Sequence, residues 1–178
     1  MAILPIYIYG SPILHKKVAP MVERPKDFDR ILIDMWETMY DDDGIGLSAN
    51  QVGLDLRFFV ADFSLRDKKM ERVVIINPEI ISAEGESIEE EGCLSLPGIR
   101  EQVPRAEKIV LRYENVDHQV IEREFSGFPA RVVQHETDHL NGRVFTDRIS
   151  SLKRSFIKSK LKRLAEKAAS GKFAKDID

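Results

Sequence analysis

Cysteine, tryptophan and long apolar runs are scarce in this 178-residue sequence. The single cysteine, Cys93, cannot form a disulfide within the chain, so its thiol is either buried filler or part of a chemical site. Glycine, proline and serine are not in excess, which excludes disordered, collagen-like and low-complexity classes. No apolar run approaches the roughly 18 to 20 residues that span a bilayer, and the first ten residues lack the basic segment of a secretory signal. We therefore expect a cytoplasmic protein without membrane contact.

The length fits one domain covering residues 1–178, and a composition of 43% hydrophobic and 32% charged residues is typical of a globular protein. The net charge of −3 is unevenly distributed. From Arg148 onwards ten basic residues stand against three acidic ones, giving +7 and leaving −10 for residues 1–147. This basic tail either steers the protein towards an anionic partner or is only a solvated helix face.

Apolar periodicity predicts three helices. The first covers residues 28–40, and Pro25 suits its first turn. It ends near Gly44, and the three consecutive aspartates before this glycine indicate that this end is strained or functional. The second begins at residue 126 or 127 and ends at 141–142, where glycine can form a left-handed cap. The third runs from about 151 to 169. Its expected apolar face consists of Leu152, Phe156, Ile157, Leu161, Leu164, Ala165 and Ala168.

Runs rich in valine, isoleucine and phenylalanine predict strands at residues 56–63, 72–77, 80–89, 109–113 and 119–125, with a turn at 115–118. Because the helices are separated from this block of strands, we expect an α+β fold. Mostly antiparallel sheets would pack around the second helix, and the amphipathic, basic helix at 151–169 would close the chain.

The second predicted helix contains two histidines four residues apart, His135 and His139, in the segment QHETDH. This spacing places both imidazoles on one helix face, one turn apart, so that both can bind the same cation. Glu136 fits a general base that takes a proton from water attacking a carbonyl and returns it to the leaving nitrogen. The segment therefore predicts a metal-dependent hydrolase.

A catalytic metal usually has three protein ligands, so one ligand is still missing. A metzincin protease would have a third histidine at position 145, where this chain has Phe145. A thermolysin-like protease would have a glutamate about twenty residues downstream, but Glu166 is farther away and lies in the basic terminal helix. Cys93, which follows a glycine in the segment EGCLS, is the remaining candidate.

Three separated segments, GIGLSANQ at 44–51, EGCLS at 91–95 and QHETDH at 134–139, resemble the peptide deformylase family in order and approximate spacing. The resemblance implies an enzyme that removes the formyl group from the N-terminal formyl-methionine of newly synthesised proteins and releases formate. The implied metal ligands are Cys93, His135 and His139. Glu136 would be the general acid/base, and the Gln51 amide and the Leu94 main-chain N–H would stabilise the oxyanion.

The resemblance also implies a substrate-binding surface. Main chain at Ile45, Gly46 and Gly92 would pair with the substrate as an added strand. Phe128 and Val132 would line an apolar pocket for the methionine side chain, although helical spacing alone would make them core residues. Three further residues match family positions where a side chain could orient ligands or substrate, and these are Arg100, Gln134 and Glu91. Glu91 could form an ion pair with Arg105, or it could be a plain surface charge.

The sequence departs from the family pattern at Ser48, Asn50 and Thr137, which puts local loop geometry and inhibitor preference in doubt. Ligand type alone permits iron(II), zinc, cobalt or nickel, and the resemblance implies iron(II). Two other functions remain open: a zinc peptidase of HExxH type, and a metal-binding or ribosome-associated module. The partners we expect are formyl-methionyl nascent chains and, through the helix at 151–169, the ribosome. We expect a monomer.

Overall fold

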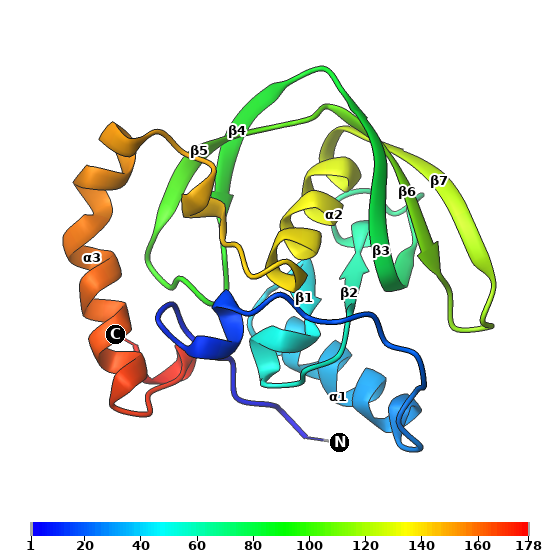
Figure 1. Ribbon diagram of the computed structural model, residues 1–178, viewed down its shortest axis with the longest axis horizontal. Coiled ribbons are helices and arrows are strands. Elements are labelled where there is room, and N and C mark those ends of the chain that lie inside the picture. The colour runs from blue at the N-terminus through cyan, green and yellow to red at the C-terminus, as the bar shows by residue number, and fades with distance from the viewer. Residues whose placement is uncertain (1, 178) are drawn as a thin grey trace.

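A computed structural model describes residues 2–177 of the chain, within which three α-helices and seven β-strands are joined by turns and short 3-10 helices (Figure 1). The helices are α1 (Phe28–Asp41), α2 (Gly127–Leu140) and α3 (Ser151–Ala169). The strands are β1 (Gly46–Ser48), β2 (Phe58–Asp62), β3 (Arg72–Glu84), β4 (Ser87–Gly92), β5 (Arg100–Arg105), β6 (Lys108–Glu114) and β7 (Val120–Ser126). No helix in this described range is long and apolar enough to cross a membrane.

The strands form two sheets, and every pairing between the strands is antiparallel. The larger sheet has the order β1-β2-β3-β6-β7, and the smaller one consists of β4 and β5. The long strand β3 pairs with β2 from Arg72 to Ile76 and with β6 from Ile76 to Glu84. The pairing with β6 contains two register shifts, the first of them next to Asn77, whose φ is 52°. Such bulges bend and twist a strand, which lets β3 lead the chain out of one sheet and towards the other.

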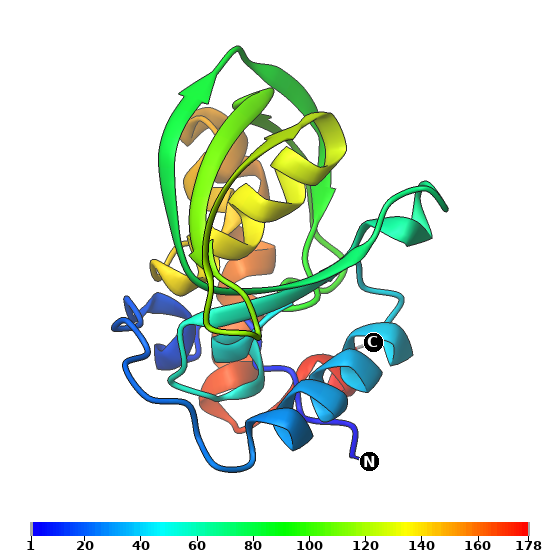
Figure 2. The ribbon, with the colours of Figure 1, turned by 90° about the vertical axis from the view of Figure 1, so that its right-hand side faces the viewer.

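Helix α2 lies between the two sheets (Figures 1 and 2). It packs against β1, β2, β6 and β7 of the larger sheet, and Arg131 reaches the main chain of Ser87 and Val103 in the smaller one. Residues 130–134 and 136–140 are all buried. A helix enclosed on all sides shows no simple amphipathic pattern, and its polar side chains must find partners inside the protein.

The expected α+β architecture is confirmed: antiparallel sheets surround the HExxH helix, and an amphipathic helix follows it. Helix α2 has the predicted limits, because Pro129 is accepted in its first turn and Gly142, with φ of 73°, continues the chain beyond Asn141 in the left-handed conformation. Helix α1 begins at Phe28, as predicted, but Pro25 is not part of its first turn. Pro25 precedes it and accepts a turn hydrogen bond from the Phe28 N–H, so the proline is outside the first helical turn.

The end of α1 leads directly into the site. Asp43 has a φ of 53°, an uncommon value for a residue other than glycine. The Gly44 N–H then donates to the Met39 carbonyl oxygen at 2.8 Å. A Cβ at Gly44 would lie 2.9 Å from the Leu94 side chain, so this turn approaches the β4–β5 connection closely, and a larger residue here would require Leu94 to shift. The expected strain is therefore located at Asp43.

Two strand predictions require correction. Residues 80–84 are not a separate strand but the second half of β3, and only after a turn at Gly85, with φ of 68°, does β4 begin. The sequence pattern did not reveal this turn, because polar and apolar residues alternate on both sides of it as they do in a strand. Strand β5 was not predicted, since its sequence REQVPR contains a single large apolar residue, Val103, which is buried in the core.

The apolar face of α3 also differs from the prediction. Ile157, Leu161 and Leu164 are buried against a cluster that includes Ile8 and Phe145. Leu152 and Phe156, however, are 66% and 75% exposed. Helix α3 lies along one edge of the molecule (Figure 1), and the described chain leaves most of these two side chains uncovered.

Candidate active site

Three potential metal ligands converge between α2 and the end of β4. His135 and His139 lie one turn apart on α2, and Cys93 directly follows β4. The Cys93 Sγ is 3.2 Å from the His139 Nε2, which is 3.2 Å from the His135 Nε2. All three donor atoms lie within 4.8 Å of one another, so one ion can contact all three. A thiolate and two imidazoles are a donor set that borderline transition metals accept, and a fourth position is left for water or substrate.

Glu91 fixes the orientation of His135. Its Oε2 is 3.0 Å from the His135 Nδ1, so this nitrogen carries the proton and Nε2 is free to bind an ion. The carboxylate also accepts hydrogen bonds from the Arg105 Nε and Nη2 at 2.5 and 2.9 Å, and from the Arg131 Nη1 at 2.6 Å. The expected Glu91–Arg105 pair is thus present, but it is buried rather than a surface charge pair.

This buried network continues along α2 to Asp138. The Arg105 Nη1 donates to Asp138 at 2.8 Å, and Arg148 binds the same carboxylate with two nitrogens. Burial opposes the ionisation of Glu91, but the hydrogen bonds from His135 and Arg105 outweigh burial and hold the pKa of Glu91 far below its usual range. Glu91 is therefore a permanent anion beneath the metal ligands.

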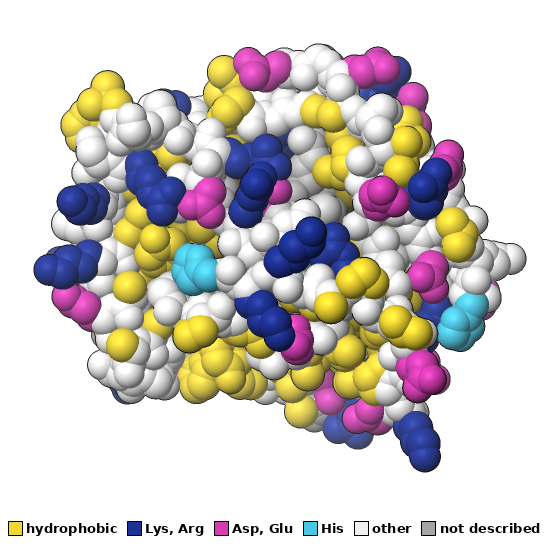
Figure 3. Space-filling model, in the orientation of Figure 1, with side chains coloured by type: hydrophobic (Ala, Val, Ile, Leu, Met, Phe, Trp, Pro, Cys, Tyr) yellow, Lys and Arg dark blue, Asp and Glu magenta, His cyan; other side chains and the backbone are white. Residues whose placement is uncertain are grey.

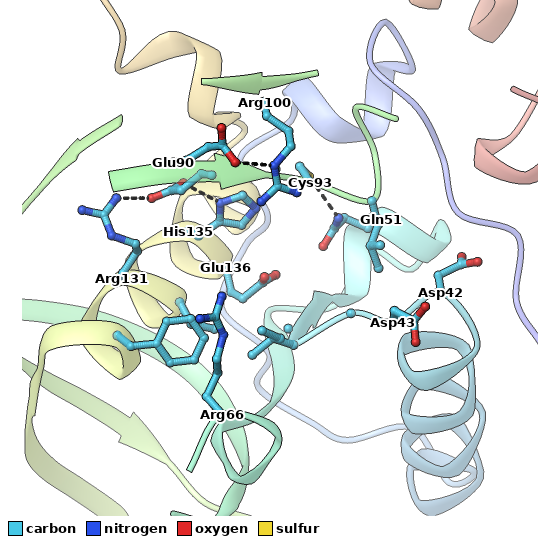
Figure 4. A pocket seen from close by; sticks show the side chains of 18 residues that line it. Asp42, Asp43, Gln51, Arg66, Glu90, Cys93, Arg100, Arg131, His135 and Glu136 are labelled. Atoms are coloured by element: carbon cyan, nitrogen blue, oxygen red, sulfur yellow. Dashed lines mark hydrogen bonds and ion pairs between the residues drawn. The ribbon is translucent and has the colours of Figure 1, made fainter. Parts of the chain in front are cut away.

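Glu136 projects into the same pocket beside the ligands (Figure 4). Its residue is 4% exposed, and burial raises the pKa of its carboxyl group, although the neighbouring His135 and Ser48 oppose that shift. The Ser48 Oγ lies 2.7 Å from the Glu136 Oε2. A raised pKa makes this carboxylate a better proton acceptor than an exposed one, which suits proton transfer from water.

Gln51 faces the ligands from the 3-10 helix Ala49–Val52. Its Oε1 accepts a hydrogen bond from the Ser48 N–H at 2.8 Å, which directs the amide NH₂ towards the Cys93 Sγ at 3.6 Å and the Ser95 Oγ at 3.1 Å (Figure 4). Gln51 is 1% exposed. Gln51 is therefore not a surface residue, and its amide donor points at the site.

Cys93 and His135, together with Glu136, line an open pocket of about 410 Å³. Every expected substrate-binding residue also lines this pocket, and these residues are Ile45, Gly46, Gly92, Arg100, Phe128 and Val132. Leu94 lies there next to Cys93 and Gln51. Gln134 does not: its amide binds the main chain of Ala106 and Ala130. The structure thus brings together residues from positions 45 to 136 that are far apart in the sequence.

Several contacts at the site were not predicted. Ser48 and Asn50 were noted only as departures from a family pattern, yet Ser48 touches Glu136 and the Asn50 Nδ2 donates to the His139 carbonyl oxygen at 2.6 Å. Arg131 was missed, although its position four residues before His135 places it on the ligand face of α2. Arg66 was also missed; its guanidinium lies 4.9 Å from the Phe128 ring centroid at the pocket.

Comparison with known proteins agrees with this geometry. The family model for polypeptide deformylase matches residues 3–155. The chain is similar to a peptide deformylase of Acidobacterium capsulatum, with 43% identity across 92% of this chain and 96% of the relative, and to one of Alkalilimnicola ehrlichii, with 45% identity across 92% of both chains. The crystal structure of peptide deformylase from Thermus thermophilus superposes with a TM-score of 0.84 and 39% identity, covering 93% of this chain and 99% of that one. The chain belongs to the polypeptide deformylase family.

Proposed function

We propose that Cys93, His135 and His139 hold a catalytic metal ion and that Glu136 transfers the proton in the reaction of this enzyme. As a member of its family, the chain is a metal-dependent hydrolase that removes the formyl group from N-formyl-methionine peptides and releases formate. The observation that supports the residue assignment is the convergence of the three donor atoms with the Glu136 carboxylate in one pocket. The bound ion would supply Lewis acidity towards the formyl oxygen and the attacking water.

Residues of the chain itself carry out proton transfer and oxyanion stabilisation. Glu136 takes a proton from the water that attacks the formyl carbon, and it delivers this proton to the methionine nitrogen when the C–N bond breaks. The developing oxyanion accepts hydrogen bonds from the Gln51 amide and the Leu94 main-chain N–H. The hydrogen bond from Ser48 to the Gln51 Oε1 supports this role, because it fixes which end of the amide faces the site.

The peptide of the substrate would bind as an added strand. Strand β1 is at the edge of the larger sheet, so one side of its main chain has no partner strand within the described residues. Ile45 and Gly46 belong to this edge, and Gly92 ends β4 across the pocket. Main-chain pairing does not depend on the side chains of the substrate, which suits an enzyme that acts on many nascent chains. Arg100, with its side chain 63% exposed, lies where it can contact the peptide beyond the first residue.

The methionine side chain would enter the apolar part of the pocket. Phe128 and Val132 are one turn apart on α2 and both face the cavity. Val132 is 9% exposed and Phe128 is partly buried, so both also contribute to the core cluster around α2. Core packing and substrate recognition are therefore compatible at these two positions.

A formate-release assay on anaerobically purified protein tests the function and the metal together. We expect release from a formyl-methionyl peptide, and no cleavage of the same peptide without the formyl group. Cleavage of internal or N-terminal peptide bonds would instead identify a zinc peptidase.

We propose iron(II) as the physiological ion, with zinc, nickel or cobalt able to occupy the same ligands. Activity should then follow iron content across preparations and be lost in air, since both a ferrous ion and a thiolate are oxidisable. Metal analysis and the formate assay on the same samples measure this relation. Activity that follows zinc content and is indifferent to oxygen would reject iron.

We further propose that the whole chain, residues 1–178, forms a single cytoplasmic catalytic domain that works as a monomer and docks on the ribosome through α3. Lys and Arg side chains gather along the edge of the molecule where α3 lies (Figures 1 and 3). Lys158, Lys160 and Lys162 are all exposed there. Ribosomal RNA attracts such a surface, and counterion release makes the binding depend on salt.

Replacing Lys158, Lys160 and Lys162 together with glutamate should lower co-sedimentation with ribosomes by roughly tenfold or more at low salt. Formate release from a free peptide should not change, because α3 contributes no residue to the pocket. The matched control carries Lys68→Glu and Lys69→Glu, two exposed lysines in the connection between β2 and β3. Binding that is absent in the wild type, independent of salt, or equally reduced in the control would reject ribosome docking.

A further inference from the structure

The short strand β1 contacts the Glu136 carboxylate with two of its residues. Gly46 and Ser48 are two positions apart, so they face the same side of the strand. A Cβ at Gly46 would lie only 2.5 Å from the Glu136 Oε1, which shows how closely the main chain approaches this oxygen. The Ser48 Oγ lies 2.7 Å from the other oxygen, Oε2. The carboxylate is thus enclosed by β1 on both of its oxygens.

The two carboxylate oxygens have different surroundings. Oε2 is held by the hydroxyl of Ser48, a residue with no exposed surface. Oε1 has no hydrogen-bond partner among residues 2–177, and Glu136 lines the open pocket. A glutamate side chain has three rotatable torsions, and a fixed hydrogen bond to one oxygen removes much of this freedom. The other oxygen is then left in one orientation, available to water or substrate.

The serine hydroxyl can keep this contact throughout a reaction. Its Oγ is 2.7 Å from the Glu136 Oε2 and 3.0 Å from the main-chain oxygen of the same residue. A hydroxyl carries one proton and two lone pairs, so it can donate to one of these acceptors at a time while still accepting from a third group. Alanine cannot make either contact.

We infer that Ser48 is a positioning residue: it holds Glu136 by Oε2 so that Oε1 is the oxygen that takes the proton from water and returns it to the leaving nitrogen. This inference rests on the proposed role of Glu136. Proton transfer falls steeply when the base is misplaced, because the reacting atoms must approach to hydrogen-bond distance in the transition state. Ser48 therefore acts on turnover through Glu136 and touches neither metal nor substrate.

Steady-state kinetics of Ser48→Ala test the inference. We expect kcat for formate release to fall roughly tenfold, as for the loss of one charge-assisted hydrogen bond, with KM and metal content unchanged. Ser48→Thr keeps the hydroxyl and should recover most of the lost kcat. The matched control is Thr137→Val, which removes a buried hydroxyl that has no partner among the described residues and lies next to Glu136; its kcat should equal that of the wild type.

A double-mutant cycle separates positioning from a general effect on the pocket. In Glu136→Asp the carboxylate is one methylene shorter and loses its contact with Ser48, so adding Ser48→Ala should change kcat less than about twofold, the error of such cycles. Equal losses in both backgrounds would overturn the inference, as would wild-type kcat in Ser48→Ala, or a loss carried by KM. If Ser48→Ala did not fold, the near-isosteric Ser48→Cys, a weak donor, replaces it in the cycle.

The acid/base role of Glu136 and the positioning role of Ser48 can be rejected separately. If Glu136→Ala retained full turnover, the proposed acid/base role would be wrong whatever Ser48 does. If Glu136→Ala were inactive while Ser48→Ala behaved as the wild type, only the positioning role of Ser48 would be rejected.

Discussion

Replacing Glu136 with glutamine is expected to lower kcat for formate release by about 10²- to 10⁴-fold, the range attributed to a positioned general acid/base. Glutamine has nearly the same shape and can still accept a hydrogen bond from the Ser48 hydroxyl through its amide oxygen. It cannot take a proton from water. The loss should therefore appear in kcat, with the fold and the three metal ligands intact.

The measurement pairs single-turnover kinetics with metal analysis of each preparation. Metal content should match the wild type, because Glu136 is not one of the three converging donors. The control is Glu122→Gln, a glutamate exposed on β7 that binds only Arg112, and it should leave kcat unchanged. Turnover by Glu136→Gln within a few-fold of wild type would show that another group carries the proton. Loss of metal would leave Glu136→Ala as the cleaner variant for the same assay.

The central helix and its chemistry were predictable because their signals are local. The spacing of His135 and His139 places both on one face of any helix, and the limits of α2 follow from Pro129 and Gly142, whose backbone preferences act within a few residues. Cys93 could be inferred only by elimination. The structure supplies what elimination lacked, a Sγ 3.2 Å from a histidine nitrogen.

The sheet was less predictable because its pairing depends on distant residues. The pattern at 80–89 alternates in the same way on both sides of Gly85, so this glycine is the one local sign that β3 ends and β4 begins. Strand β5 has almost no apolar signal, and it is held by its pairing with β4 and by Arg105, which the Glu91 carboxylate binds. Tertiary contacts override propensity at such positions.

The supporting contacts of the site were out of reach for a related reason. The contact between Ser48 and Glu136 joins residues 88 positions apart, and Arg131 meets Glu91 across 40 positions. Neither a serine nor an arginine has a local sequence pattern that predicts such a distant partner. Leu152 and Phe156 on α3 were predicted to be buried but are exposed. Periodicity identifies the apolar face of a helix, but it does not show whether the rest of the protein extends far enough to cover that face.

Replacing Glu91 with glutamine is expected to lower the free energy of unfolding by about 3–5 kcal/mol, the usual cost of removing one member of a buried ion pair. Arg105 is fully buried and Arg131 nearly so, and both bind this carboxylate. Metal affinity should also fall roughly 10- to 100-fold, because the His135 Nδ1–H would face a neutral amide instead of the carboxylate that now orients it. Urea unfolding and competition with a chelator measure the two effects.

The neighbouring Glu90→Gln is the matched control. Glu90 also pairs with an arginine, Arg100, but both side chains are more than half exposed, so its loss should cost less than about 1 kcal/mol and leave metal affinity unchanged. Equal destabilisation by the two variants would mean that the buried Glu91 network contributes no more to the free energy of unfolding than an exposed ion pair does. Unchanged metal affinity in Glu91→Gln would remove its role in orienting His135 while leaving its role in stability.

The pH dependence of unfolding gives Glu91 a second signature. Its pKa in the folded protein is held below the ordinary carboxyl value of 4.5, because the hydrogen bonds from His135 and Arg105 outweigh the opposing effect of burial. A carboxyl group with a lowered folded pKa binds more protons when unfolded, so its contribution to stability is complete above its ordinary pKa and is lost as the pH falls below that value. The wild type should therefore lose stability in acid more steeply than Glu91→Gln, and the two unfolding curves should converge at low pH. Parallel curves would mean that the charge of Glu91 is not what links Arg105, Arg131 and His135 into one structure.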